Sequence, residues 1–212
     1  MINDELYSRY VTALLQGDVR LCAEIVTHLL KENTETTTIY TELFQKSLYR
    51  VGELWEMNRV SVAVEHLATA ITERMLANVY PALLSNVSPN GRKALICCSV
   101  NEYHQIGARM VADIMETRGW DVSFLGANTP VNDMLLMIQE KQSEILGLSV
   151  SIYFNMASLH RTIEIVRASF PGLNIFVGGQ GFRWGGTDIS KKFSNIEYVP
   201  SIQTLDTIIA GR

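Results

Sequence analysis

The chain has 212 residues, of which 47% are hydrophobic and 19% are charged, and its formal net charge at pH 7 is -4. This is the balance of a globular protein long enough for two modest domains, and it offers no general attraction to nucleic acid or to anionic lipid. The three cysteines are too few for a disulfide framework, and no apolar stretch approaches the about 18 residues that a membrane span needs. We therefore expect a cytoplasmic protein that binds neither DNA nor membranes directly.

The first part of the chain predicts helices. Apolar residues recur at helical spacing in four stretches, which polar or glycine-containing breaks separate. These stretches cover residues 6–18, 21–30, 39–55 and 62–80. Ser61 stands just before the last stretch, where a hydroxyl can cap the first turn of a helix. We expect an all-α helical bundle over residues 1–86.

The pattern changes after a loop rich in Ser, Asn, Pro and Gly at residues 85–93. Short apolar runs then alternate with helical patterns. The runs cover residues 93–100, 121–126, 144–151, 174–179 and 196–200. Strands that are apolar on both faces and separated by helices are typical of a parallel sheet covered on both sides. For residues 92–212 we predict a flavodoxin-like (Rossmann-like) α/β domain with a five-stranded parallel sheet, whose ligand crevice lies at the carboxyl ends of the strands.

The loop after the first predicted strand carries a distinctive pairing of side chains. Residues 101–107, NEYHQIG, place Glu102 two residues before His104 and end in Gly107. A carboxylate beside an imidazole suits a metal-ligand histidine, because the second ring nitrogen needs a partner that fixes its tautomer and raises its basicity. By itself, a histidine at the start of a helix is more often a solvated or capping residue.

Two further loops are expected at the same edge of the sheet. Ser149 and Ser151 follow the third strand, and Gly178 and Gly179 follow the fourth. Hydroxyls can hydrogen-bond a polar ligand, and glycines let a bulky group pass close to the backbone, although a glycine pair alone is usually a turn. A nucleotide-binding glycine loop would belong after the first strand instead. It is the ordered combination of the three motifs that indicates one site.

In this order the motifs resemble the base-off, His-on cobalamin-binding domain of methionine synthase, corrinoid mutases, methyltransferase corrinoid proteins and cobalamin photoreceptors. The resemblance implies that His104 is the lower axial ligand of cobalt and the metal-binding residue. Glu102 would stand behind it, where most of these relatives have Asp; Glu resembles the photoreceptor branch. The resemblance also implies that the serine and glycine pairs line the slot for the displaced dimethylbenzimidazole tail, with Gly107 completing the first motif.

The bundle carries a second motif, in which Trp55 is followed by Glu65 and His66. In an unrelated bundle the tryptophan would be a core residue and the other two a solvated face. The spacing W-x9-E-H, however, resembles the signature of the CarH-type light-sensing repressors. That resemblance implies that the three residues contact or adjoin an adenosyl group, so the expected cofactor is adenosylcobalamin, with methylcobalamin or hydroxocobalamin as other forms. Glu56 stands where those repressors have a histidine that captures cobalt after photolysis, so the fate of the cobalt is expected to differ.

The resemblance implies a non-enzymatic photoreceptor or sensor, which signals after light breaks the cobalt–carbon bond. A regulatory protein or self-association would carry the signal, and we expect a homo-oligomer. The DNA-binding domain of the repressors is not expected, because the first helical pattern begins by Asp4. The alternative is a corrinoid protein that carries a methyl group for a methyltransferase system, but a methyl group needs no polar or aromatic pocket of adenosyl size. A cobalamin store or chaperone is a third class, and a second chromophore such as a bilin stays open.

Overall fold

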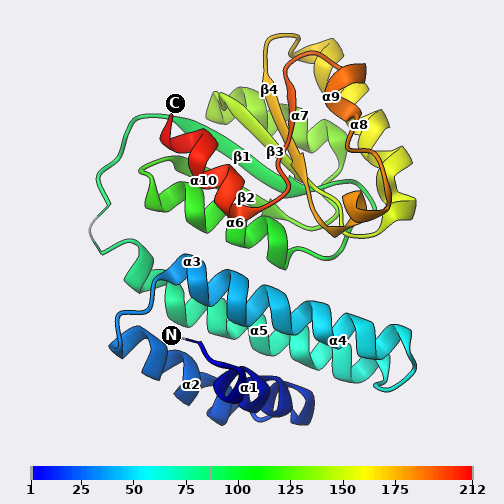
Figure 1. The fold of residues 1–212 in the computed structure, drawn as a ribbon. Coiled ribbons are helices and arrows are strands. Elements are labelled where there is room, and N and C mark those ends of the chain that lie inside the picture. Colours follow the sequence, from blue (N-terminus) through cyan, green and yellow to red (C-terminus); the bar gives the residue numbers. More distant parts are fainter. Residues whose placement is uncertain (1, 86, 212) are drawn as a thin grey trace. The chain divides into compact units, whose positions relative to one another are not determined.

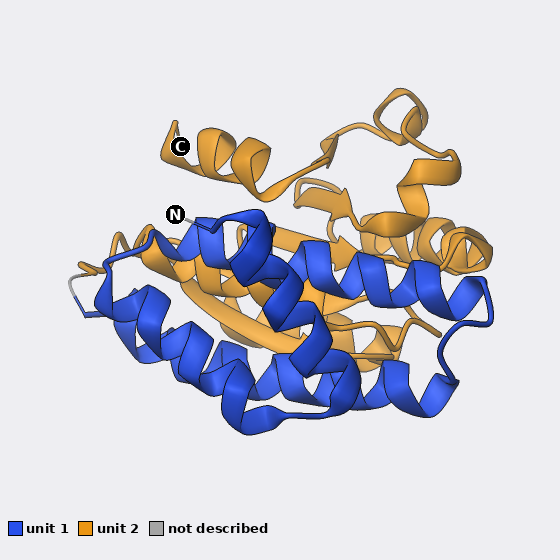
Figure 2. Cartoon of the chain, turned by 60° about the horizontal axis from the view of Figure 1, so that its bottom comes forward, with its two compact units in different colours: residues 1–86 blue, residues 87–212 orange. Residues whose placement is uncertain are grey.

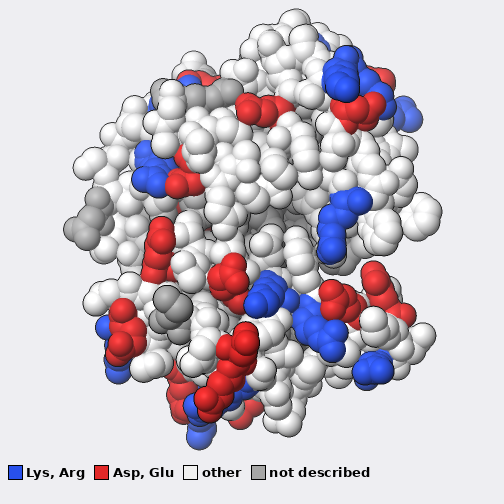
Figure 3. Space-filling model, viewed as in Figure 1, with Lys and Arg blue, Asp and Glu red and all other residues white. Residues whose placement is uncertain are grey.

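The chain folds as two units, residues 1–86 and 87–212 (Figure 2). They are seen in a computed structural model that describes residues 2–85 and 87–211. Among these residues no helix is both long enough and apolar enough to cross a membrane. On the face shown in Figure 3, acidic and basic side chains are interspersed rather than separated by sign.

Unit 1 is helical throughout its regular structure, as the apolar periodicity predicts. Its elements are α1 (Asp4–Gln16), α2 (Val19–Lys31), α3 (Thr36–Thr38), the π-helical η1 (Ile39–Gln45), α4 (Lys46–Glu56) and α5 (Val62–Leu83). Polar side chains cap three of the helices: Asn3, Asp18 and Ser61 each accept a hydrogen bond from a backbone N–H three residues further on. The hydroxyl cap predicted before α5 is therefore confirmed.

The core of unit 1 is aromatic. The rings of Tyr10 and Tyr40 pack against Phe44, and all three side chains are buried. Two of these residues belong to η1, where the N–H of Lys46 donates to the carbonyl of Thr41, five residues back. The sequence predicts one continuous helix over 39–55, and the structure differs by beginning it with this π-helical segment.

Unit 2 is built on a parallel sheet. Its strands are β1 (Lys93–Cys98), β2 (Asp121–Gly126), β3 (Ile145–Ser149), β4 (Asn174–Gly178) and β5 (Ile196–Tyr198). They lie in the order β2-β1-β3-β4-β5, and every neighbouring pair is parallel. This is the strand order of the flavodoxin-like folds, so the predicted fold class is confirmed.

Helices cover both faces of the sheet, with α6 and α10 on one side and α7 and α8 on the other (Figure 1). The bounds of the helical elements are α6 (Ile106–Thr117), α7 (Val131–Lys141), η2 (Tyr153–Asn155), α8 (Met156–Ser169), η3 (Gln180–Trp184), α9 (Ile189–Lys192) and α10 (Ile202–Ala210). The three central strands, β1, β3 and β4, are buried along most of their length, because helices pack against both faces of the sheet.

The three cysteines are free thiols inside the two units. Cys22 lies in α2, and the neighbours Cys97 and Cys98 end β1, with all three buried. Burial raises the pKa of Cys22 to about 11 and that of Cys98 to about 12, because the thiolate would be poorly solvated. The three cysteines, too few in the sequence for a disulfide framework, are thus buried thiols in the structure.

Candidate functional site

The carboxyl ends of the three central strands lie side by side. The register pairs Cys98 with Ser149 and Ser149 with Gly178, so β1, β3 and β4 end at the same level. The alignment continues beyond the strands, because the N–H of Ser99 donates to the carbonyl of Ser149 and the N–H of Val150 donates to that of Gly178, both at 2.9 Å. The three loops predicted to share one edge therefore do so.

Glu102 and His104 are in direct contact in the loop after β1. Oε1 of Glu102 lies 2.6 Å from Nδ1 of His104 and also accepts from the backbone N–H of His104 at 3.0 Å. The carboxylate is fully buried, whereas the imidazole side chain is 53% exposed. Because Nδ1 faces the carboxylate, Nε2 lies on the opposite side of the ring, away from Glu102.

The second carboxylate oxygen of Glu102 is held by the loop after β3. Oε2 accepts from the backbone N–H groups of Ser151 at 2.8 Å and Ile152 at 2.9 Å, and from Nδ2 of Asn155 at 3.1 Å. With the two bonds from His104, the carboxylate accepts five hydrogen bonds. A buried carboxylate with this many donors is fully satisfied and rigidly placed.

Two opposing effects set the pKa of Glu102. Burial alone would raise it, because the charged form loses its water. The hydrogen bonds from the side chain of His104 and from the backbone of Ile152, His104 and Ser151 lower it, and together they bring the pKa to about 2. Glu102 is thus ionised at neutral pH and favours the proton of a neutral His104 on Nδ1, which makes Nε2 the nitrogen that can donate a lone pair.

The two glycines after β4 make room for the protein's own backbone. A Cβ atom on Gly179 would lie 2.3 Å from the carbonyl oxygen of Val150, and one on Gly178 would lie 2.8 Å from that of Val199. Gly179 also has a φ of +108°, which side chains rarely tolerate. Close chain packing therefore accounts for both glycines, and their place in a cofactor slot stays a prediction.

The structure places the two predicted serines at the end of a strand and Gly107 in a helix. Ser149 ends β3, and Ser151 lies two residues further on; both are partly buried. Their hydroxyls make no hydrogen bond among the residues that the structure describes, 2–85 and 87–211. Gly107 lies in the first turn of α6, not in the loop, because that helix begins at Ile106. Its predicted position is wrong, and no other atom lies within 4 Å of the point where its Cβ would stand.

Sequence reasoning missed several residues at this edge. Asn155 binds Glu102, and Asn128, in the loop after β2, donates from its backbone to the carbonyl of Glu102. Exposed apolar side chains also adjoin the site residues in sequence: Tyr103, Ile152, Tyr153 and Phe154. The apolar run Ile152, Tyr153 and Phe154 directly after the second serine was a signal that the sequence offered, since large apolar side chains on a loop often contact a ligand.

Of the three predicted bundle residues, Trp55 and His66 lie on the surface of unit 1, whereas the side chain of Glu65 is 22% exposed. Trp55, near the end of α4, is 47% exposed, so the interpretation of it as a core residue is wrong. Glu65 and His66 lie in the first turns of α5, where Oε2 of Glu65 is 3.6 Å from Nε2 of His66. The structure records no hydrogen bond from Trp55 to either of them in the part of the chain it describes.

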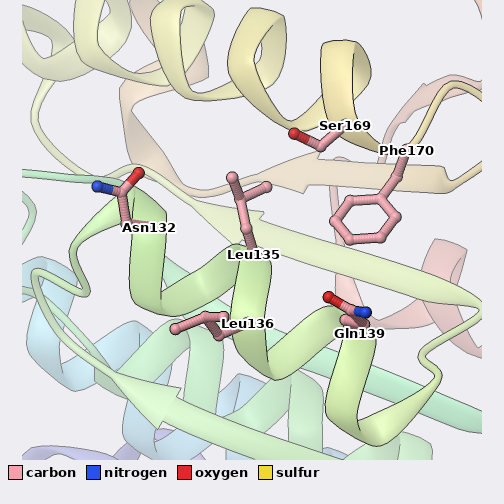
Figure 4. Close-up of a pocket in the computed structure, with 6 residues that line it drawn as sticks. All are labelled: Asn132, Leu135, Leu136, Gln139, Ser169 and Phe170. Carbon is pink, nitrogen blue, oxygen red and sulfur yellow. The ribbon is translucent and has the colours of Figure 1, made fainter.

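A shallow groove lies elsewhere on unit 2, between α7 and the end of α8. Figure 4 shows Leu135 and Phe170 reaching into it, and the complete lining is Asn132, Leu135, Leu136, Gln139, Ser169 and Phe170. None of the residues predicted for the cofactor site is among them.

The fold defines a class, the flavodoxin-like α/β proteins with a helical N-terminal unit. Two domain families, each described as a B12 binding domain, match residues 6–80 and residues 92–196. The chain therefore belongs to the B12-binding domain proteins, and its cofactor class is cobalamin.

Relatives of known name include two repressors of Myxococcus xanthus. The chain is 29% identical over 125 residues to the HTH-type transcriptional repressor CarA, covering 59% of this chain and 43% of CarA. It is 27% identical over 147 residues to the HTH-type transcriptional repressor CarH, covering 68% of this chain and 48% of CarH. The matched part is thus less than half the length of these curated relatives.

Similar solved structures come from Methanosarcina barkeri. The monomethylamine corrinoid protein superposes with a TM-score of 0.84 at 14% identity, over 98% of both chains. The methanol:cobalamin methyltransferase complex superposes with a TM-score of 0.51 at 15% identity, over 100% of this chain and 82% of that one. At these identities the likeness shows the fold alone.

The residues at the sheet edge fit a cobalamin. His104 offers a single imidazole donor whose other nitrogen is fixed by an ionised carboxylate. A neutral imidazole whose tautomer is fixed in this way would supply the metal of a bound cobalamin with one nitrogen donor. Exposed apolar side chains belong to two residues of these loops, Tyr103, which precedes His104 in the chain, and Ile152, whose backbone N–H binds Glu102.

Proposed function

We propose that this protein is a cobalamin-binding sensor that holds its cofactor through His104. The observation that carries the proposal is the 2.6 Å contact between the half-exposed imidazole and the buried carboxylate of Glu102. The carboxylate keeps the proton at Nδ1 of His104, and Nε2 is the atom proposed to bind cobalt. Ser149, Ser151, Gly178 and Gly179 are proposed to line the slot for the nucleotide tail, with Gly107 at the edge of the site.

The residues of unit 1 are proposed to respond to the upper ligand, with adenosylcobalamin as the form sensed. Trp55 and His66 support this proposal because their side chains are exposed on the bundle, and Glu65 lies next to His66 with its side chain 22% exposed. The similarity to CarA and CarH supports it independently, since those proteins are transcriptional repressors. Glu56 is exposed beside Trp55, and a carboxylate there is a poorer cobalt ligand than an imidazole.

When bound, the cobalamin supplies a cobalt–carbon bond that light can break and that a methyltransferase can use. Trp55, Glu65 and His66 would contact an adenosyl group in one state and lose those contacts in the other. A ligand shifts a conformational equilibrium only by its differential contacts, so these residues would set the size of the response. The output is proposed to be a change in self-association or in binding to a regulatory protein.

A second candidate is a corrinoid protein that carries a methyl group for a methyltransferase. It is favoured by the superposition on the monomethylamine corrinoid protein over almost the whole chain. The same His104 site would serve either function. The exposed Trp55 favours the sensor, because a methyl group gives an indole of this size little to contact.

The two candidates are separated by comparing adenosylcobalamin with methylcobalamin on the purified protein. For the sensor, the adenosyl form binds more tightly, and green light changes size-exclusion elution and limited proteolysis in that form only. For the carrier, the two forms bind equally and light changes neither measurement. Absorption spectra of the same samples test cofactor binding itself, since histidine ligation gives a spectrum distinct from that of the free cofactor.

A further inference from the structure

Asn128 bonds to three consecutive residues that precede His104. It lies in the loop between β2 and α7, 24 positions after His104 in the chain. Its Oδ1 accepts from the N–H of Asn101 at 2.9 Å, and its Nδ2 donates to the hydroxyl of Tyr103 at 3.0 Å. Its backbone N–H donates to the carbonyl of Glu102 at 3.0 Å. One residue from a different loop thus spans the segment that leads to the proposed ligand.

From these contacts we infer that Asn128 is a positioning residue for His104 and Tyr103. The inference rests on the proposed function, because it concerns how His104 meets the cofactor. His104 is hydrogen-bonded directly to Glu102. The contribution of Asn128 is to hold the backbone segment 101–103, and so to position Glu102 and the adjoining His104. It also binds the hydroxyl of the exposed Tyr103, the residue that precedes His104 in the chain.

The chemistry of an amide suits this position. An amide accepts at Oδ1 and donates at Nδ2 at once, and here both ends are used on residues two apart. The backbone of Asn128 has a φ of 48° and that of Asn101 a φ of 67°, values that asparagine tolerates better than most residues. An aspartate could keep both contacts, because a carboxylate can accept from the N–H of Asn101 and from the hydroxyl of Tyr103 if that group donates.

The test uses Asn128→Gly, which removes the side chain and relieves the positive φ rather than straining it. The matched control is Asn195→Gly, since Asn195 has a φ of 56° and its side chain makes no hydrogen bond in the described residues of unit 2. Asn128→Asp is the rescue variant.

The first measurement needs no cofactor. In the full-length protein without cobalamin, the Asn101 amide should exchange its hydrogen about fivefold faster or more in Asn128→Gly, because it loses its acceptor. The Asn195→Gly control and Asn128→Asp should resemble the wild type. Equal exchange of the Asn101 amide in Asn128→Gly and wild type overturns the inference.

The second measurement uses methylcobalamin and its absorption spectrum. In Asn128→Gly the ratio of histidine-ligated to unligated bound cofactor should fall about fivefold or more, with recovery in Asn128→Asp. A merely structural role would lower the thermal stability of both glycine variants and leave this ratio unchanged, and that result overturns the inference. A wild type without any histidine-ligated spectrum sinks the proposed function instead, while the exchange measurement still decides the role of Asn128.

If Asn128→Gly does not fold, the variant Tyr103→Phe tests the inference in its place. This variant deletes only the hydroxyl that accepts from Nδ2 of Asn128. It should lower the same spectral ratio by a smaller factor, about twofold to fivefold. A ratio equal to that of the wild type contradicts the inference.

Discussion

Each unit contains a glutamate–histidine pair at a motif that the sequence links to the cofactor, and the two pairs differ in their physical setting. In unit 2, Glu102 is buried and lies 2.6 Å from His104. In unit 1, Glu65 lies 3.6 Å from His66, whose side chain is 75% exposed. The first carboxylate accepts five hydrogen bonds, and the second accepts one from the hydroxyl of Thr69 besides this loose ion pair.

The difference teaches which contacts the fold itself fixes. A buried carboxylate with this many donors keeps its place because losing any one bond would leave a buried polar group unsatisfied. The side chain of Glu65 is 22% exposed, but its partner His66 is largely in solvent, and an ion pair of that kind contributes little. Glu102 and His104 are thus fixed in place by the folded chain, whereas the imidazole of His66 is held only by the 3.6 Å ion pair with Glu65.

The largest effect should come from removing the proposed ligand. His104→Ala should abolish the spectrum of histidine-ligated cobalamin and weaken cofactor binding by tenfold or more, on the order of the loss seen for a metal-site residue. The fold should survive, because the imidazole is half-exposed. His66→Ala is the control and should keep the spectrum. Absorption titration measures both, and an unchanged spectrum in His104→Ala refutes the assignment.

Glu102→Gln should weaken cofactor binding less than His104→Ala does, since an amide oxygen still accepts the imidazole proton.

Removing each glutamate in turn should change the free energy of unfolding by different amounts in the two units. Glu102→Ala should cost about 3 to 5 kcal/mol in the free energy of unfolding, because it leaves the buried donors of Ser151, Ile152 and Asn155 without an acceptor. Glu65→Ala should cost less than about 1 kcal/mol. Chemical denaturation of the protein without cobalamin gives both values. Equal costs would show that the buried network does not hold the fold.

The pH dependence of stability should follow the low pKa of Glu102. Its pKa is about 2 in the folded protein against an ordinary value of 4.5, so the unfolded state binds more protons between these values. The stabilisation is therefore present above about pH 4.5 and is lost as the pH falls towards 2, on the order of 3 kcal/mol in total. Glu102→Gln should lack this component, and Glu65→Gln should retain it. Denaturation curves at several acidic pH values measure the difference.

The smallest effect is expected for Trp55. Trp55→Ala should cost about 1 kcal/mol or less in the cofactor-free protein, because nearly half of the side chain is already exposed. Trp120→Ala, at a site that is 3% exposed, should cost about 3 to 5 kcal/mol and serves as the core control. Binding assays should show that Trp55→Ala has lost the preference for adenosylcobalamin over methylcobalamin. If both tryptophans cost the same, Trp55 acts as packing rather than as a cofactor contact.

The fold could be predicted because its signals are local. Apolar period and turn residues predict each of the five strands. The π-helical segment at Ile39–Gln45 escaped prediction for a physical reason. A helix that shifts its hydrogen bonds by one residue still buries the same apolar side chains, so the hydrophobic pattern carries little trace of it.

The strand order predicts that the three loops share one edge, but the individual contacts within the site were predictable only where the residues are neighbours in the chain. Glu102 and His104 are two positions apart, and their chemistry is visible in the motif. Asn155 reaches Glu102 from 53 positions away, and Asn128 reaches Asn101 from 27. Nothing in the local sequence distinguishes these asparagines from ordinary turn residues, because their roles arise only when the strands are aligned. For the same reason the backbone contacts of Gly178 and Gly179 could not be foreseen.

The buried cysteines have a practical consequence for observing the bundle. Maleimides and similar probes react with thiolates, and the thiols of Cys22 and Cys98 titrate far above neutral pH while Cys97 is fully enclosed in β1. A cysteine introduced at an exposed position, such as Met57 after α4, would therefore be labelled selectively in the native background. Fluorophores or spin labels could report on the surroundings of Trp55 without replacing any natural thiol.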